Sequence, residues 1–204
     1  VCVCVCCLFR FVTRFFVSLS AVVVNEGYNG PAAAAAERLD IKIMRLLESD
    51  RIAGLFSLLG DENEELLEDE EVSENDVALI LHTSGTTSRP KIVPLLQSNI
   101  AASASNIAQS LSLSSSDRCL NVMPLFHIHG LIAAVSASLS VGASIWCSSG
   151  FNALSFFSNL DEAKPTWYTA VPTMHQAILA RAGRNAITIK NNPLRFLRSS
   201  SASL

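Results

Sequence analysis

Residues 82–91 read HTSGTTSRPK. This segment lies between two short apolar runs, VALIL at 77–81 and IVPLL at 92–96, which predict a strand on each side of it. Gly85 lets the backbone approach a ligand closely, and successive loop N–H groups together with hydroxyl side chains bind anions. Lys91 adds a full positive charge. The segment therefore predicts either an anion-binding loop or an ordinary polar turn between two hairpin strands.

The spacing of residues in this segment and the distribution of charge along the chain exclude some classes of ligand. No GK[ST] follows four residues after a glycine, so the loop is not a Walker A motif. Residues 61–76 hold ten of the eighteen acidic residues, whereas residues 77–204 hold nine Lys or Arg against three acids. A basic body with a separate acidic run suits a small anionic ligand. A dense basic stripe with interleaved aromatics is absent from the sequence, so we expect no nucleic-acid partner.

The first 24 residues raise the question of a membrane segment. They are almost wholly apolar and long enough to span a bilayer. Arg10 and Arg14 lie in the middle of this segment, where each charge costs about 2.5–3.5 kcal/mol on insertion. We expect a buried strand or a mis-joined coding segment here, and a membrane anchor is the alternative.

Four of the six cysteines lie in VCVCVCC at residues 1–7. No second CxxC or pair of histidines completes a zinc site in the sequence. We therefore expect free thiols in a reducing compartment and no metal ion. A cytoplasmic location fits this expectation.

Strands and helices alternate at short intervals from residue 76 onward. The predicted strands are 77–81, 91–96, 118–125, 143–148, 165–171 and 194–204, and the predicted helices are 98–111, 130–142, 151–164 and 173–183. Ser98 is the expected N-cap of the first of these helices. An earlier helix and strand are expected within residues 30–43. This order predicts an α/β fold with a largely parallel, helix-covered sheet, whose ligands bind at the strand ends.

Further motifs follow the hydroxyl loop: MPLFHIHGL at 123–131, TWYTAVPTMHQAIL at 166–179 and RFLRSSSASL at 195–204. With TSGTTSRPK at 83–91 they resemble, in order, the motifs of the adenylate-forming (AMP-dependent synthetase/ligase) superfamily, which includes acyl-CoA synthetases. The resemblance covers residues 76–204 and implies part of the large N-terminal domain of such an enzyme.

The resemblance also implies a division of the chain. We expect an apolar segment at 1–24, a partial α/β unit at 25–60, an acidic linker at 61–76 and a partial AMP-binding domain at 77–204. The family's acidic motif, its ribose-binding aspartate, its hinge and its C-terminal domain with the catalytic lysine have no counterpart up to Leu204. We therefore expect this chain alone to be incomplete for catalysis.

Site residues follow from the resemblance. The loop that holds the β- and γ-phosphates of ATP corresponds to Thr83, Ser84, Gly85, Thr86, Thr87 and Lys91. The expected catalytic residue is His127, which corresponds to a histidine near the acyl carboxylate and the α-phosphate. The segment beside the adenine and the acyl pocket corresponds to Ser199, Ser200, Ser201 and Ala202.

The other histidines and aromatics have plainer interpretations. His127 and His129 form an HxH pair, but the sequence offers no third ligand for a metal. His129 either lines the acyl pocket or caps the helix that follows it. His82 and His175 are expected to be structural. Trp167 and Tyr168 are expected in the core.

The implied activity is that of an ATP-dependent acid–thiol ligase, and the resemblance also implies a peroxisomal location as the alternative to a cytoplasmic one. ATP with Mg²⁺ activates a small carboxylic acid as an acyl-adenylate, and coenzyme A then captures the acyl group. Ser88 stands where most members have glycine, and the motif combination is similar to the oxalate–CoA ligase branch among coumarate–CoA ligase-like enzymes, which implies oxalate or another short dicarboxylate. Ile92 stands where glycine commonly follows the lysine. A catalytically inactive nucleotide-binding remnant is the alternative function.

Overall fold

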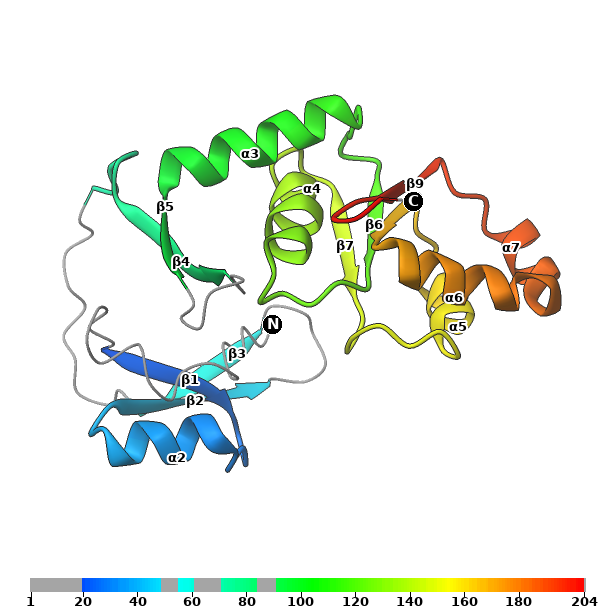
Figure 1. Cartoon of the computed structure of the whole chain (residues 1–204). Coiled ribbons are helices and arrows are strands. Elements are labelled where there is room, and N and C mark those ends of the chain that lie inside the picture. Colours follow the sequence, from blue (N-terminus) through cyan, green and yellow to red (C-terminus); the bar gives the residue numbers. More distant parts are fainter. Residues whose placement is uncertain (1–19, 49–54, 61–70, 84–90, 204) are drawn as a thin grey trace. The chain divides into compact units, whose positions relative to one another are not determined.

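The computed structural model describes residues 20–48, 55–60, 71–83 and 91–203 (Figure 1). The chain divides into two compact units, and the boundary lies between Glu71 and Val72. The expected linker at 61–76 lies partly outside the described residues, and its described part, 71–76, is exposed. The expected apolar segment at 1–24 is described only from residue 20 onward.

The first unit contains a small mixed sheet. Its strands are β1 (Ala21–Asn25), β2 (Lys42–Glu48) and β3 (Phe56–Leu59), with β2 in the middle. β1 runs parallel to β2, and β3 runs antiparallel to it. The helix α2 (Pro31–Arg38) connects β1 to β2, begins with a proline in its first turn and buries Ala33 and Ala36. The expected helix and strand within residues 30–43 are thus confirmed.

The second unit opens with a β-hairpin. The strands β4 (Val77–Thr83) and β5 (Lys91–Leu96) pair antiparallel, and Thr83 lies opposite Lys91. Residues 84–90, the tip of the hydroxyl loop, lie outside the described residues. The hairpin therefore brings the two ends of the loop together.

The helix α3 (Gln97–Ser110) follows β5 without a break. Ser98 was expected as its N-cap, and this prediction is wrong because the helix already begins at Gln97. The side chain of Asn99 accepts a hydrogen bond from the Leu96 N–H at 3.0 Å. A residue inside the first turn thus bonds back to the residue before the helix.

The main sheet of the second unit is wholly parallel. Its strand order is β7-β6-β8-β9. The strands are β6 (Arg118–Asn121), β7 (Ser144–Cys147), β8 (Trp167–Ala170) and β9 (Phe196–Ser199). The helices between them are η1 (His129–Ser136), α4 (Ala137–Leu139), α5 (Phe156–Ala163), α6 (Pro172–Ala182), η2 (Gly183–Asn185) and α7 (Ala186–Asn191). The expected largely parallel, helix-covered sheet is confirmed.

Side chains alternate between two apolar layers, one on each face of this sheet. Leu120 and Tyr168 pack with α5 and α6 on one face. Cys119 and Trp167 pack with α3, η1 and α4 on the other. Figure 1 shows these helix groups on either side of the strands. Trp167 and Tyr168 are buried, which confirms their expected place in the core.

The helix after β6 begins in a π-helical form at η1. Gly130, its second residue, lies against the loop from Met123 to Pro124. A Cβ at this position would lie 2.5 Å from the Pro124 carbonyl oxygen and 2.9 Å from that of Met123. Only glycine allows this close approach of two backbones, and the approach fixes where the helix, and with it His129, begins.

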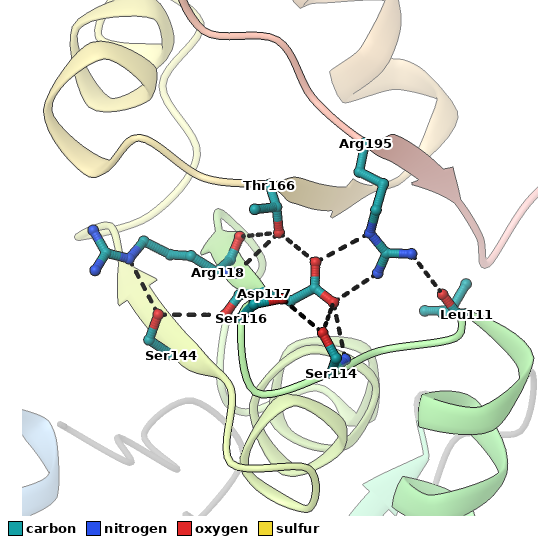
Figure 2. Close-up of polar contacts among 8 residues, drawn as sticks. All are labelled: Leu111, Ser114, Ser116, Asp117, Arg118, Ser144, Thr166 and Arg195. Atoms are coloured by element: carbon teal, nitrogen blue, oxygen red, sulfur yellow. Dashed lines mark hydrogen bonds and ion pairs between the residues drawn. The ribbon is translucent and has the colours of Figure 1, made fainter.

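A buried carboxylate joins the strands at the amino edge of the main sheet, just before β6, β8 and β9 start (Figure 2). Asp117 is 3% exposed and accepts from Arg195 Nη2 at 2.7 Å and Arg195 Nε at 3.1 Å. Thr166 Oγ1 donates to it at 2.7 Å, and the Ser114 N–H at 2.9 Å. Burial by itself would raise the pKa of Asp117, but these hydrogen bonds and the Arg195 charge outweigh burial and lower it.

Candidate functional site

The ends of the hydroxyl loop are the described part of the expected phosphate site. Thr83 and Lys91 are register partners, and Lys91 is exposed at the start of β5. The other expected loop residues, Ser84, Gly85, Thr86 and Thr87, lie outside the described residues. Their assignment to the phosphates stays a prediction.

His127 lies on the exposed loop between β6 and η1. Its ring contacts that of Phe126, with the centroids 4.5 Å apart. Its backbone N–H donates to the Pro124 carbonyl at 3.3 Å, and its carbonyl accepts from the Leu131 N–H at 3.0 Å. The backbone is therefore fixed while the side chain faces solvent, and the expected catalytic role of His127 stays a prediction.

His129, two residues further on, is buried at the carboxyl edge of the main sheet. Its Nε2 lies 2.7 Å from Thr169 Oγ1 in β8, and its Nδ1 lies 3.1 Å from Ser201 Oγ in the turn after β9. Both ring nitrogens thus contact side chains from other elements rather than the backbone of the helix that follows. The capping interpretation of His129 is therefore wrong, and its ring lies among the strand ends where ligands of parallel sheets bind.

The surroundings of His129 keep its imidazole neutral. Burial, followed by the positive charges of Arg198 and His175, lowers the pKa of His129 to about 4. At pH 7 one ring nitrogen therefore donates and the other accepts, which matches two hydroxyl partners that can each do either.

We expect stability to fall as the pH is lowered through the range between the ordinary histidine pKa of about 6.5 and the folded-state pKa of about 4. In that window the unfolded chain binds a proton at His129 that the folded chain does not, so acid favours unfolding. Thermal unfolding midpoints measured from pH 7.5 to 4.5 should drop less steeply for His129→Asn than for the wild type. Equal slopes for the wild type and His129→Asn would contradict the assignment.

The segment from Ser199 to Ala202 points its side chains in different directions. Ser199 lines a groove on the α5–α6 face, and its buried Oγ has no hydrogen-bond partner. The Ser200 N–H donates to the Ala170 carbonyl at 3.3 Å, which extends the pairing of β9 with β8. Ser201 turns the chain with φ +74°, and Ala202 is exposed. Of these four residues, Ser201 is the one whose side chain bonds to His129.

The groove on the α5–α6 face has a volume of about 740 Å³ and is mostly apolar. Its few polar side chains include His175, whose Nδ1 lies 3.0 Å from the Tyr168 hydroxyl and whose Nε2 lies 3.1 Å from the Arg198 carbonyl. His175 thereby ties α6 to β8 and β9. This contact supports its expected structural role.

Two residues of the carboxyl edge were not expected from the sequence. Thr169 sits in the middle of an apolar strand, and nothing in the sequence distinguishes Arg198 beyond its place in the motif RFLRSSSASL. The register pairs Thr169 with Arg198, and Arg198 Nη1 donates to Thr169 Oγ1 at 3.4 Å. A basic residue inside a predicted parallel strand was the one available signal, because such strands are otherwise apolar.

The described parts of the chain, residues 20–48, 55–60, 71–83 and 91–203, hold no group of three or more His, Cys, Asp or Glu side chains placed to bind a metal ion. Nor does any helix in those same parts have the length and hydrophobicity of a membrane span. Cys119 is buried and Cys147 is exposed, and both are free thiols.

Comparison with known proteins assigns the family. The family described as AMP-binding enzyme matches residues 17–204. The oxalate–CoA ligase of Arabidopsis thaliana is 42% identical over 184 residues, which are 88% of this chain and 35% of that protein. The oxalate–CoA ligase of Saccharomyces cerevisiae is 42% identical over 133 residues, which are 64% of this chain and 23% of that protein. The chain thus spans about a third of the first relative and less of the second.

Solved structures show the same fold. An ATP-bound RpMatB-BxBclM chimera has a TM-score of 0.69 and 25% identity, and the match covers 90% of this chain and 35% of that one. A malonyl-CoA ligase with methylmalonyl-CoA and AMP bound has a TM-score of 0.69 and 23% identity over 90% of this chain and 36% of that one. The expected fold, part of the N-terminal domain of an adenylate-forming enzyme, is confirmed. The chain belongs to the AMP-binding enzyme family.

Proposed function

We propose that this chain forms the phosphate-binding and part of the acid-binding region of an ATP-dependent acid–thiol ligase. The observation that carries the proposal is the hairpin, which pairs Thr83 with Lys91 and so closes the hydroxyl loop beside a full positive charge. The loop belongs to a chain of the AMP-binding family. Phosphate oxygens need such donors, since a site that excludes water has to replace their hydration shell.

The proposed reaction has two steps. The substrate carboxylate attacks the α-phosphorus of ATP and pyrophosphate leaves. The thiol of coenzyme A then loses its proton and attacks the acyl carbonyl of the adenylate, and AMP leaves as the thioester forms. Carboxylate and triphosphate repel each other, so cationic and N–H groups have to stabilise the charge of the transition state. Lys91 and the loop N–H groups are proposed for the β- and γ-phosphates, and His127 for the acyl carboxylate.

Mg²⁺ accompanies ATP in this proposal. Oxygen atoms are its preferred ligands, and the triphosphate supplies them. The described residues hold no group of three or more His, Cys, Asp or Glu side chains placed for a metal ion, and the hydroxyl loop is proposed to hold the phosphates. Adenine and the acyl group are proposed to lie beside the turn that contains Ser199, Ser200, Ser201 and Ala202.

The proposed substrate is a small carboxylic acid, with oxalate as the first candidate. Two relatives at 42% identity are named oxalate–CoA ligases. The carboxyl edge of this chain adds a physical reason, because its hydroxyl, imidazole and guanidinium groups suit a polar acid better than a long apolar one.

The test is acid-dependent exchange between ATP and pyrophosphate, measured on the longest native polypeptide that contains this chain. We expect Lys91→Gln to slow oxalate-dependent exchange by about a hundredfold or more, because a charge proposed to stabilise the leaving pyrophosphate is lost. Lys190→Gln, which removes an exposed lysine of α7, should leave the rate unchanged.

Two outcomes would argue against this function. Exchange that no carboxylic acid stimulates, in a protein that still binds ATP, would favour a catalytically inactive nucleotide-binding protein. Equal rates for Lys91→Gln and Lys190→Gln would remove Lys91 from the phosphate site even if the ligase activity is present.

A further inference from the structure

Three side chains from three elements meet at the carboxyl edge of the main sheet. Thr169 Oγ1 in β8 lies 2.7 Å from His129 Nε2 at the start of η1. The same oxygen accepts from Arg198 Nη1 in β9 at 3.4 Å. Thr169 is fully buried, so the hydroxyl is a fixed point that orients both the imidazole and the guanidinium.

Arg198 has no anionic partner among the described residues. It is half-buried, and no described carboxylate forms an ion pair with it. Burial lowers the pKa of its guanidinium, with no carboxylate charge acting in the opposite direction. The same positive charge contributes to the low pKa of His129. Among the described residues, the Arg198 guanidinium at the carboxyl edge is therefore a half-buried positive charge without a carboxylate partner. Such a charge destabilises the fold unless an anion binds to it.

Arg195, at the other end of the same strand, provides the contrast. Its guanidinium is bound through Nε and Nη2 to both carboxylate oxygens of Asp117. β9 thus begins beside Arg195, whose guanidinium is paired with a carboxylate. Near its end β9 contains Arg198, whose guanidinium has no carboxylate partner among the described residues. A guanidinium has five N–H donors in a planar fork that fits a carboxylate with two parallel hydrogen bonds, and Arg198 uses one donor in a long bond to Thr169.

We propose that Arg198, oriented by Thr169 and next to the neutral His129, binds the second anionic group of a short dianionic acid. The inference rests on the proposed function for the identity of the ligand as an acid substrate. It goes beyond that function by assigning the residue that distinguishes a dicarboxylate from a monocarboxylate. The reacting carboxylate is proposed to lie at His127, so each anionic group of the acid has its own partner.

The experiment measures binding first, because binding does not depend on catalysis. Oxalate and malonate are titrated into the protein by calorimetry at constant ionic strength, with acetate and propionate as monoanions and inorganic phosphate as a non-acyl anion. We expect the Kd of the dianionic acids to be at least about tenfold lower than that of the monoanions, as a bidentate charged contact allows. Any binding of phosphate should be independent of Arg198, because the hydroxyl loop is the proposed phosphate site.

The variants separate charge from geometry. Arg198→Gln should raise the Kd of oxalate and malonate to the level of the monoanions and leave acetate and propionate unchanged. Arg198→Lys keeps the charge but loses the planar fork, and should give an intermediate Kd. Arg184→Gln removes an exposed arginine of η2 and should behave like the wild type. Thermal unfolding of each variant, together with its unchanged monoanion binding, shows that the fold is retained.

Failure of this inference is distinguishable from failure of the proposed function. A preference for dianionic acids that Arg198→Gln does not alter would overturn the inference while acid-dependent exchange stands. Phosphate bound as tightly as oxalate in an Arg198-dependent way would also overturn it, in favour of a simple anion site. Arg198-dependent oxalate binding without exchange by any acid would support the inference and reject the ligase function.

Discussion

Replacing Asp117 with alanine is expected to lower the free energy of unfolding by about 3 kcal/mol. The carboxylate accepts from Arg195, Thr166 and the Ser114 backbone, and these groups come from three places around the amino edge of the sheet. Without it, the half-buried Thr166 hydroxyl, the Ser114 N–H and half of a guanidinium lose this acceptor at once. Urea unfolding of wild type and variant, followed by circular dichroism, measures the difference.

A surface ion pair in the same chain is the matched control. Asp161 and Lys164 pair at 2.6 Å, but both side chains are more than half exposed. Asp161→Ala should therefore cost much less stability than Asp117→Ala. A double-mutant cycle with Asp117→Ala and Arg195→Ala should give strongly non-additive losses. Additive losses, or a cost no larger than that of the control, would show that the cluster does not hold the strands together.

The second large effect is expected at Trp167, where alanine should cost about 3–5 kcal/mol. The side chain is fully buried in the middle of the sheet and stacks on Phe196 of the next strand, with ring centroids 5.3 Å apart. No neighbouring group can fill the space of an indole, so a cavity remains between β8 and the α3–α4 layer. Thermal and urea unfolding measure the loss.

Phenylalanine at the same position separates packing from polarity. The Trp167 Nε1 is buried and has no hydrogen-bond partner, so its removal costs no bond. We expect Trp167→Phe to lose less than about 1.5 kcal/mol, because the ring stays and one unsatisfied donor disappears. A loss as large as that of alanine would mean that the indole N–H has a partner in solution.

The parallel sheet was predictable because its signals are local. The strands of the main sheet lie in short runs rich in apolar residues, and β6, β7 and β8 are each followed by a helix. β3 and α7 were not predicted, because they lack such local signals. β3 is four residues long and exposed, so it has no pattern that distinguishes it from a loop. α7 is a single short helix without a buried residue.

The candidate site was predictable only in part. Motifs gave the hydroxyl loop and the HxH pair, but the sequence left open which interactions His129 makes. Its two partners lie 40 and 72 residues further along the chain. Thr169 and Arg198 become neighbours only through the register of β8 and β9. Contacts of this range follow from strand order and register, which a single sequence does not specify.

The two ends of β9 differ in their surroundings, and substitutions at each end should therefore affect the protein differently. Asp117 at the amino edge and the two apolar layers help to hold the strands together. Thr169, Arg198 and Ser201 sit at the opposite edge, away from the Asp117 cluster. If Arg198 binds the acid as proposed, a saturation library limited to Arg198 and Ser201 should alter the preference for acids while the folded scaffold survives. Such changes should be reachable by single substitutions, without a prior stabilising step.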